Sequence, residues 1–360
     1  MHFGQINTNR EWGGGENQIL HLVQALSAMG EQVTLFAHPE GELLRRASDM
    51  GFSACALPCR GGRPSVRKTA AAVAQAGIDL LHVHDSGSSD LGAAVGRRLN
   101  IPVVLSRRVA SSIRRNPFSC MKYSRRNFRA VLAISNTVRD VFLKTSSFPA
   151  EDVFVVPSGV DIGELDAVAR DYEFRRSFGG QYLVGGVGKL SPKKNWQFLV
   201  RVAARMAETD LDIRWLVAGD GGERESLELL ADELGVADRV QFMGFRSDAL
   251  RILKNLDLLF FPSIIEGASV TVRECMVLGT PVVAVDAAGT MESLAGHGRG
   301  VADGDVEGAV QGVTELLTNS ELRDRCVTGA RRYAVEHFTY DRTATGTLAV
   351  YRKVLGENDK

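Results

Sequence analysis

Short apolar segments alternate with amphipathic segments along most of the chain. The apolar segments have the length of buried strands, and the intervening segments repeat apolar residues at helical spacing, as Ile19, Val23 and Leu26 do. This alternation is typical of α/β proteins in which helices cover parallel sheets. The predicted strands span residues 3–7, 32–37, 80–84, 103–106, 131–134, 182–187, 213–218, 240–242, 258–262 and 282–285.

The alternation begins again at residues 182–187, after a polar stretch from about residue 161 to residue 180. A chain of 360 residues is long enough for two domains, each with its own core. We therefore expect two doubly wound sheets that face each other across a cleft, the usual ligand site of this architecture.

Composition excludes several classes of protein. The chain is 44% hydrophobic, its 43 basic and 43 acidic residues balance, and no apolar run reaches the roughly 18 residues of a membrane span. Five cysteines without a CxxC pair favour reduced thiols over a disulfide framework or a zinc site. No basic-then-apolar signal pattern is present, so we expect a cytoplasmic protein.

One segment departs from the charge balance. Residues 91–139 contain 11 lysines and arginines and no acidic residue, whereas the rest of the chain carries 32 basic against 43 acidic residues. Such a run is often only a solvated face. Its cations must gather on loops and helices, because the predicted strands within it are apolar, and aromatic residues are interleaved with them. The segment predicts a basic, partly apolar surface that suits an anionic membrane.

Two glycine-rich turns follow predicted strands. Gly13–Gly15 precede the first predicted helix, where backbone amides can approach a phosphate, although a tight turn needs glycine anyway. Residues 185–195 also begin with glycines, but they do not form a P-loop, because Leu190 stands where a magnesium-binding hydroxyl should follow Gly-Lys. Lys189 and Lys194 remain as candidates to meet an anion, although either lysine alone is more often solvated.

A pair of glutamates carries the third candidate motif. Glu266 and Glu274 are eight residues apart, and they precede an apolar segment that ends in Gly-Thr-Pro. On one helix they would lie roughly 12 Å apart along its axis, at about 1.5 Å per residue. This matches the distance from the sugar to the ribose of an extended nucleotide sugar, and the alternative is a pair of exposed glutamates.

Together these motifs make the chain resemble glycosyltransferase family 4, the "group 1" family of retaining enzymes with the GT-B fold. The resemblance implies an N-terminal acceptor domain over residues 1–165, a donor-binding domain over 166–338 and a helix over 339–360 that packs back on the first domain. The matching segments, in the family's order, are Gly13–Gly15, His82-Val83-His84-Asp85, Pro157-Ser158-Gly159-Val160-Asp161, Val187-Gly188-Lys189-Leu190 with Lys194-Asn195, Gly219-Asp220-Gly221, Val240-Gln241-Phe242-Met243-Gly244, and Glu266 with Glu274.

The resemblance also implies roles for individual residues. Lys189 and Lys194 would hold the donor diphosphate, with the backbone of Gly14, Gly15 and Gly188. Glu266 would hold the transferred sugar together with Gly267, Ala268 and Ser269. Glu274 would bind the ribose, and the backbone of Phe245 and Arg246 would meet the base. Preset cations would stabilise the charge that develops on the leaving diphosphate.

Three departures from the family pattern affect these roles. The family often has arginine where Lys189 stands, an exchange that suits a point charge but not a bidentate contact. Ala268 and Ser269 stand where the family usually has Phe-Gly, which leaves the identity of the donor sugar open. Arg108 stands where many members have a histidine, so His84 is the best catalytic histidine, although strand-end histidines are structural about as often as functional. Arg107 or Arg108 could bind a phosphate or carboxylate of the acceptor.

The sequence predicts no metal and no cofactor. Asp303-Gly304-Asp305 resembles a DxD metal motif, but it precedes the apolar-periodic segment 306–317, so helix capping is favoured. In the family the leaving phosphate is thought to take the acceptor proton, so no protein base is needed.

The resemblance, together with the basic segment, implies a retaining glycosyltransferase for an anionic saccharide, lipid-linked or part of a lipopolysaccharide-like envelope, at the inner face of the cytoplasmic membrane. One alternative is a sugar-nucleotide epimerase with two related domains. Another is a nucleic-acid-binding protein that uses residues 91–139, but no nucleic-acid motif is present and we expect no such partner.

Overall fold

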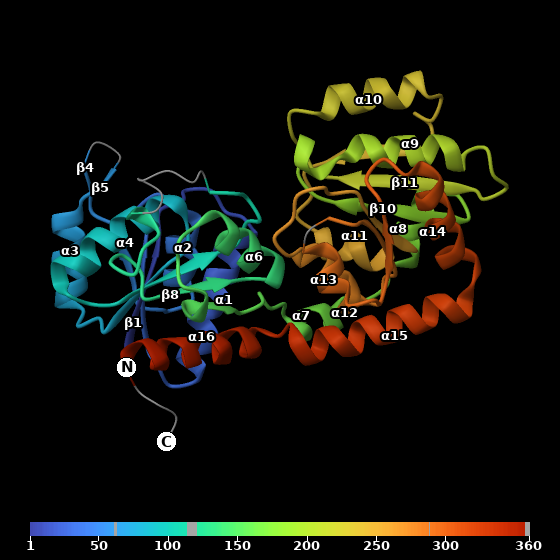
Figure 1. The fold of residues 1–360 in the computed structure, drawn as a ribbon. Helices are drawn as coiled ribbons and strands as arrows, with labels where there is room; N and C mark the ends of the chain where they lie inside the picture. Colours follow the sequence, from blue (N-terminus) through green and yellow to red (C-terminus); the bar gives the residue numbers. More distant parts are fainter. Residues whose placement is uncertain (61–62, 114–120, 288, 357–360) are drawn as a thin grey trace. The chain divides into compact units, whose positions relative to one another are not determined.

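The computed structural model describes residues 1–60, 63–113, 121–287 and 289–356 (Figure 1). The chain divides into two compact units, of which unit 1 comprises Met1–Gly159 with Tyr340–Lys360 and unit 2 comprises Val160–Thr339. The first division follows Gly159 rather than residue 165, because Val160 forms a β-bridge with Thr339 and is buried in the core of unit 2. The last helix belongs to unit 1.

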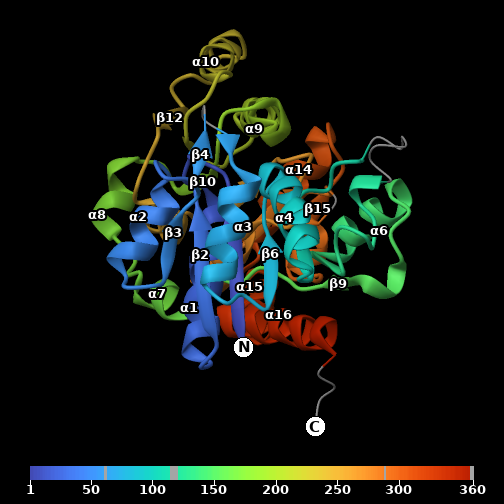
Figure 2. The ribbon, with the colours of Figure 1, turned by 90° about the vertical axis from the view of Figure 1, so that its left-hand side faces the viewer.

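Unit 1 is a seven-stranded parallel sheet in the order β3-β2-β1-β6-β7-β8-β9, covered by helices on both faces (Figures 1 and 2). One buried apolar cluster joins the sheet to α1, α2 and α16, and another joins it to α3, α4 and α6. The elements are β1 (His2–Asn7), α1 (Gly14–Ala28), β2 (Gln32–Ala37), α2 (Glu42–Asp49), β3 (Ala54–Ala56), the antiparallel pair β4 (Cys59–Arg60) and β5 (Arg63–Pro64), α3 (Val66–Gln75), β6 (Leu80–Val83), α4 (Ser86–Leu99), β7 (Val103–Arg107), β8 (Ala130–Ala133), α6 (Asn136–Thr145), the 3-10 turn Ala150–Asp152, β9 (Val153–Val155) and α16 (Tyr340–Leu355).

Unit 2 is a six-stranded parallel sheet in the order β12-β11-β10-β13-β14-β15. Helices α9, α10 and α14 share one apolar cluster with the sheet, while α7, α11, α12 and α15 share the other. The elements are α7 (Ile162–Ala167), α8 (Tyr172–Ser177), β10 (Tyr182–Val187), the 3-10 turn Pro192–Lys194, α9 (Trp196–Met206), β11 (Ile213–Ala218), α10 (Arg224–Glu233), β12 (Val240–Gly244), α11 (Ala249–Asn255), β13 (Leu258–Phe261), α12 (Val270–Leu278), β14 (Val282–Val285), α13 (Thr290–Leu294), β15 (Arg299–Val301), α14 (Val306–Thr318) and α15 (Ser320–His337).

The α/β fold class with two doubly wound sheets is confirmed. Strands β2, β10, β11 and β14 have the predicted bounds, and the other predicted strands differ by one or two residues at an end. Within the described parts of the chain, no helix has the length and apolarity that a membrane span needs.

The strand order places the candidate residues at one edge of each sheet. In each unit the first strand of the sheet, β1 or β10, lies between the second strand and a later one, so the order reverses there. Ligands of doubly wound sheets bind beside such a reversal, at the carboxyl ends of the strands. The glycine turn, His84 and Arg108 follow β1, β6 and β7, whereas the Lys189, Phe245 and Glu266 segments follow β10, β12 and β13.

Candidate functional site

The loop that carries Lys189 is held by backbone contacts to a second loop. Gly188 donates to the Ala218 carbonyl at 2.9 Å, and the Trp196 indole donates to the Lys189 carbonyl at 3.1 Å. A Cβ on Gly219 would lie 1.9 Å from the Gly188 oxygen, so only glycine permits this approach. The segment Gly219-Asp220-Gly221 after β11 therefore supports the Lys189 loop.

Lys194 and Glu266 form an ion pair in unit 2. Lys194 ends the 3-10 turn after β10, and its ammonium lies 2.5 Å from Oε1 of Glu266. The Ser263 hydroxyl also contacts that oxygen, at 2.8 Å, and the Phe261 ring lies 5.2 Å from the ammonium. Two residues with separate predicted roles, at the diphosphate and at the sugar, therefore lie side by side.

The prediction that Glu266 and Glu274 share one helix is wrong. Helix α12 begins at Val270, after Ser269, whose hydroxyl accepts from the Val272 amide at 3.3 Å. Serine favours such N-cap positions because its oxygen satisfies an unpaired amide of the first turn. Glu266 lies in the preceding loop, so the 12 Å separation along a helix axis does not apply.

The loop after β14 supports the segment around Glu266. Gly289 has φ +90°, and a Cβ there would lie 2.2 Å from the Gly267 oxygen and 3.0 Å from the Glu266 oxygen. The backbone of Glu266 and Gly267 thus lies close to the Gly289 loop, and the Ser269 hydroxyl serves as the helix cap.

Glu274 lies on α12 and is mostly buried. Burial, and secondarily the like charge of Glu164 on α7, raise the pKa of Glu274 to about 7. Among the described residues its carboxyl has no hydrogen-bond or ion-pair partner. A desolvated carboxyl of this kind costs folding free energy and is typical of binding and catalytic positions.

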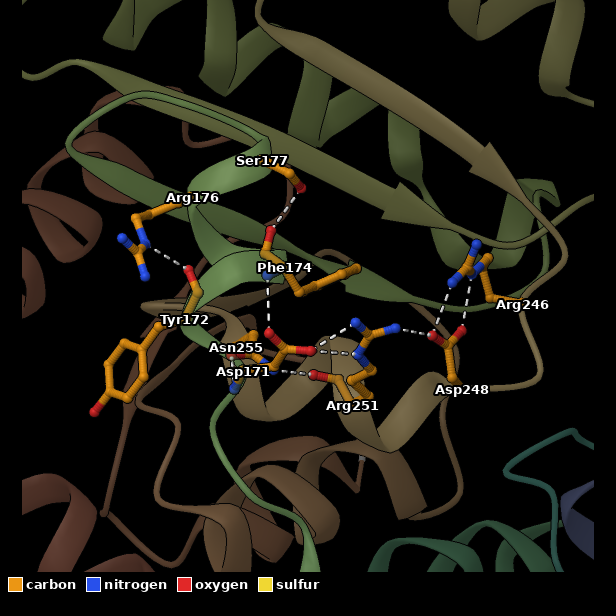
Figure 3. Close-up of polar contacts among 9 residues, drawn as sticks. All are labelled: Asp171, Tyr172, Phe174, Arg176, Ser177, Arg246, Asp248, Arg251 and Asn255. Carbon is orange, nitrogen blue, oxygen red and sulfur yellow. Dashed lines mark hydrogen bonds and ion pairs between the residues drawn. The ribbon is translucent and has the colours of Figure 1, made fainter.

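The predicted base-binding segment follows β12 and carries an ion-pair chain (Figure 3). The Phe245 side chain is 81% exposed. The Arg246 guanidinium is paired with Asp248 at 2.8 and 2.7 Å, Asp248 contacts Arg251 at 3.4 Å, and Arg251 contacts Asp171 at 2.6 Å (Figure 3). These pairs tie the segment to α8 and α11, so its backbone is held while the Arg246 charge is neutralised.

Asp305 caps helix α14, as predicted, by accepting from the Gly308 amide at 2.9 Å. Asp303 accepts instead from the Asn195 side chain at 2.9 Å. The described residues contain no cluster of three or more His, Cys, Asp or Glu side chains that could hold a metal ion.

In unit 1, Arg108 joins the glycine turn to His84. Its Nη1 donates to the Gly15 carbonyl at 2.6 Å, and its Nη2 donates to Nδ1 of His84 at 3.2 Å. Because arginine cannot accept, Nδ1 of His84 is unprotonated and Nε2 carries the hydrogen, which it donates to Gln5 Oε1 at 2.7 Å. Both ring nitrogens of His84 are therefore bonded within unit 1.

The hydrogen-bond chain continues to α16. Gln5 donates to the Tyr351 hydroxyl at 3.1 Å, and that hydroxyl lies 2.6 Å from Nδ1 of His82. Nε2 of His82 lies 2.8 Å from the Ser106 hydroxyl. Burial lowers the pKa of both histidines well below 6.5, and the charge of Arg108 adds to the effect, so both rings are neutral. This series of hydrogen bonds holds the glycine turn against the sheet. The predicted catalytic role of His84 stays a prediction.

The two arginines predicted to bind the acceptor are already engaged. Burial lowers the pKa of Arg108 to about 10, against the opposing effect of Glu16, so Arg108 remains charged at neutral pH. Arg107 donates to the Ser111 carbonyl at 2.5 Å and to its hydroxyl at 3.1 Å. Helix α1 begins at Gly14, so its first amides face the same carboxyl edge of the sheet.

The basic segment 91–139 is partly neutralised by acids that flank it. Lys122 pairs with Asp90 at 2.9 Å, and Arg125 pairs with Glu151 at 2.8 Å and with Asp152 at 2.6 Å. Arg114 and Arg115 lie outside the described residues. The segment is therefore less uniformly cationic than the sequence predicts.

Comparison with known families assigns both units. The model of the glycosyltransferases of group 1 matches residues 170–333, and that of glycosyltransferase family 4 matches residues 12–164. The chain belongs to the group 1, family 4 glycosyltransferases. As a member it is a nucleotide-sugar-dependent glycosyltransferase, which selects sugar transfer over the epimerase and nucleic-acid-binding alternatives.

Two relatives of this glycosyltransferase align with about three quarters of the chain. An uncharacterised glycosyltransferase of Methanocaldococcus jannaschii is 28% identical over 294 residues, 76% of this chain and 75% of the relative. The alpha-D-kanosaminyltransferase of Streptomyces kanamyceticus is 24% identical over 300 residues, 76% of this chain and 77% of the relative.

Solved structures identify the fold as GT-B. Anabaena HepE in complex with UDP has a TM-score of 0.84 and is 19% identical, and the alignment covers 98% of this chain and 100% of the HepE chain. The apo lipopolysaccharide outer core galactosyltransferase WaaB has a TM-score of 0.74 and 16% identity, over 98% of this chain and 99% of its own.

Several residues of this glycosyltransferase were not singled out from sequence. Ser263 and Gly289 position Glu266, and Tyr351 and Gln5 hold the histidine pair. A glycine a few residues after a buried strand was a usable signal for Gly289. No local pattern marks Tyr351, because it meets His82 from 269 residues away in sequence.

Proposed function

We propose that this glycosyltransferase transfers a sugar, with retention of anomeric configuration, from a nucleotide diphosphate sugar to an anionic saccharide that is lipid-linked or part of the cell envelope. The observation that carries the proposal is the Lys194–Glu266 ion pair at the carboxyl edge of the unit 2 sheet, next to the loop that carries Lys189. On the adjoining helix the carboxyl of Glu274 has no partner among the described residues. This edge is where a doubly wound sheet binds nucleotides.

In this proposal each of these residues contacts a different part of the donor. Lys189 and Lys194 bind the diphosphate and stabilise the charge that develops on it as the bond to the sugar breaks. Glu266 orients Lys194 and accepts hydrogen bonds from sugar hydroxyls, and Glu274 accepts from the ribose. The acceptor oxygen attacks the anomeric carbon on the face that the diphosphate leaves, and a phosphate oxygen takes the acceptor proton. No protein base is then required.

Two observations support an anionic acceptor and a peripheral position at the inner face of the cytoplasmic membrane. Unit 1 carries the basic segment, in which Arg98, Arg126 and Arg129 are exposed. One structural relative is named for lipopolysaccharide synthesis. A relative named 2-deoxystreptamine glucosyltransferase points to a second acceptor class, so an acceptor assay should include both lipid-linked saccharides and soluble aminocyclitols such as 2-deoxystreptamine.

A thermal-shift panel of nucleoside diphosphates and nucleotide sugars tests the donor assignment. A ligand at 100 times its Kd adds about 2.7 kcal/mol to the free energy of unfolding. We expect a shift of several degrees for one nucleoside diphosphate and its sugar conjugates, and a much smaller shift for the matching monophosphate, which lacks half of the lysine contacts. Uniform or absent shifts across the panel would contradict the proposal.

Transfer activity should survive EDTA, because the ammonium groups of two lysines supply the positive charge at the diphosphate that magnesium supplies in other enzymes. The measurement is the transfer rate after dialysis against EDTA, with and without added magnesium or manganese. Loss of activity on chelation and its recovery with metal would overturn this expectation and return Asp303 and Asp305 to consideration as ligands.

A further inference from the structure

A cavity in unit 1 lies at the opposite edge of the sheet from the catalytic loops. It has a volume of about 730 Å³ and opens where β7 and β8 begin, beside the last turns of α4 and α16. Substrates of doubly wound sheets bind at the carboxyl ends of the strands, so this cavity is not the acceptor site. Its described lining residues are Gly96, Arg97, Asn100, Ile101, Pro102, Val103, Arg125, Arg126, Asn127, Arg129, Val354 and Leu355.

The positive charge of the cavity is only partly compensated. Arg125 is neutralised by Glu151 and Asp152, but the described lining contains no acidic residue. Arg97 donates to the Asn127 amide oxygen, a neutral partner, and keeps its charge. Arg126 and Arg129 are exposed, and neither forms an ion pair with any described residue. Three guanidinium groups thus face one cavity, and guanidinium is the side chain that best matches the oxygens of a phosphate.

The apolar part of the cavity lining argues against a nucleotide or inorganic phosphate as the ligand. Val354 and Leu355 of α16 line it together with Ile101 and Pro102, so cations and aliphatic side chains share one site. No aromatic residue is among the described lining, so a nucleotide would lack a surface on which to stack its base. Inorganic phosphate would leave the aliphatic wall unused. A phospholipid uses both parts, since its phosphate is anionic and its glycerol and first acyl carbons are apolar.

We propose that this cavity binds the phosphate of an anionic phospholipid headgroup, with the start of the acyl chains against Val354 and Leu355. The proposal rests on the peripheral membrane association included in the proposed function, and it assigns that association to one site. Binding there leaves the carboxyl edge of the sheet open to the acceptor, because the two sites lie at opposite edges.

Flotation of the full chain with vesicles tests the site. The probes are phosphatidylcholine vesicles with and without phosphatidylglycerol, and the variants are Arg126→Gln with Arg129→Gln against a control of Arg67→Gln with Lys68→Gln. Both pairs remove two exposed charges from unit 1, but only the first pair lines the cavity. At about 1 kcal/mol for each basic residue at an anionic surface, the first pair should weaken binding to phosphatidylglycerol vesicles about thirty-fold and the control less than three-fold.

The outcomes separate the site from the wider proposal. Equal weakening by both pairs would overturn the headgroup site while leaving a general electrostatic attraction to membranes. Absence of vesicle binding by the unmodified chain would overturn both the site and the peripheral association. Binding of soluble glycerol 3-phosphate, detected by calorimetry, without vesicle binding would assign the cavity to a free phosphate and overturn the lipid. Nucleotide affinity should be unchanged in every variant, so failure of donor binding in the unmodified chain would count against the proposed glycosyl transfer alone.

Discussion

Replacing Lys194 by alanine is expected to lower kcat by about 100- to 1000-fold, equivalent to the roughly 2.7–4 kcal/mol of a lost charge-stabilising donor. The ammonium faces Glu266 at 2.5 Å and belongs to the loop that adjoins Lys189. Its charge matters most when the diphosphate leaves, so kcat should fall more than KM rises. Steady-state transfer rates with a fixed acceptor measure the effect.

The adjacent residue provides the control. Lys193 is exposed, and only its backbone carbonyl takes part in the site, by accepting from the Ile264 amide at 3.0 Å. Lys193→Ala keeps that carbonyl and removes the same charge, so it should change kcat less than three-fold. Similar losses in the two variants would show that general positive charge, rather than the ammonium of Lys194, serves the reaction.

Glu274→Gln is expected to weaken nucleotide binding and, at the same time, to stabilise the ligand-free protein above pH 7. The folded protein raises the pKa of this carboxyl from 4.5 to about 7, so ionisation opposes folding. The cost is absent below about pH 4.5, grows as the pH rises, and reaches about 3 kcal/mol above pH 7, at roughly 1.4 kcal/mol per pH unit. Glutamine cannot ionise and avoids this cost, but it offers the ribose a neutral acceptor, which should weaken binding about ten-fold or more.

Two measurements check this pair of effects. The melting temperature of Glu274→Gln should exceed that of the unmodified chain at pH 8 and match it near pH 4, and titration calorimetry with a nucleoside diphosphate should show the weaker binding. Glu164→Gln is the control, because it removes the like charge beside Glu274 without removing the ribose ligand. A lower melting temperature at pH 8, or unchanged nucleotide affinity, would mean that Glu274 has a structural role only.

The sheet strands could be predicted because most residues of a parallel strand are buried on both faces of the sheet and are therefore mostly apolar. This is why residues 32–37 and 213–218 were placed with the right bounds. The Glu266 segment was misplaced because spacing alone does not show where a helix begins. Ser269, a favourable N-cap, marked the start of α12 and was available in the sequence.

Interactions between distant segments account for most of what the sequence did not show. His84 was proposed as a catalytic group from its position after a strand, but its ring nitrogens are bonded to Gln5 of β1 and to Arg108, which follows β7. The basic segment contains no acidic residue of its own, but Asp90, which directly precedes it, and Glu151, which follows it in the sequence, pair with two of its cations. Such pairings depend on the tertiary fold, which no local pattern encodes.

The central claim is that the carboxyl edge of the unit 2 sheet binds the donor diphosphate, and a crystal structure with a bound nucleoside diphosphate tests it most directly. The ligand should be the diphosphate that gives the largest thermal shift. The account predicts phosphate oxygens within hydrogen-bond distance of the Lys189 and Lys194 ammonium groups, and ribose hydroxyls at the Glu274 carboxylate. A diphosphate bound away from these lysines, for example among the arginines of the unit 1 cavity, would contradict it.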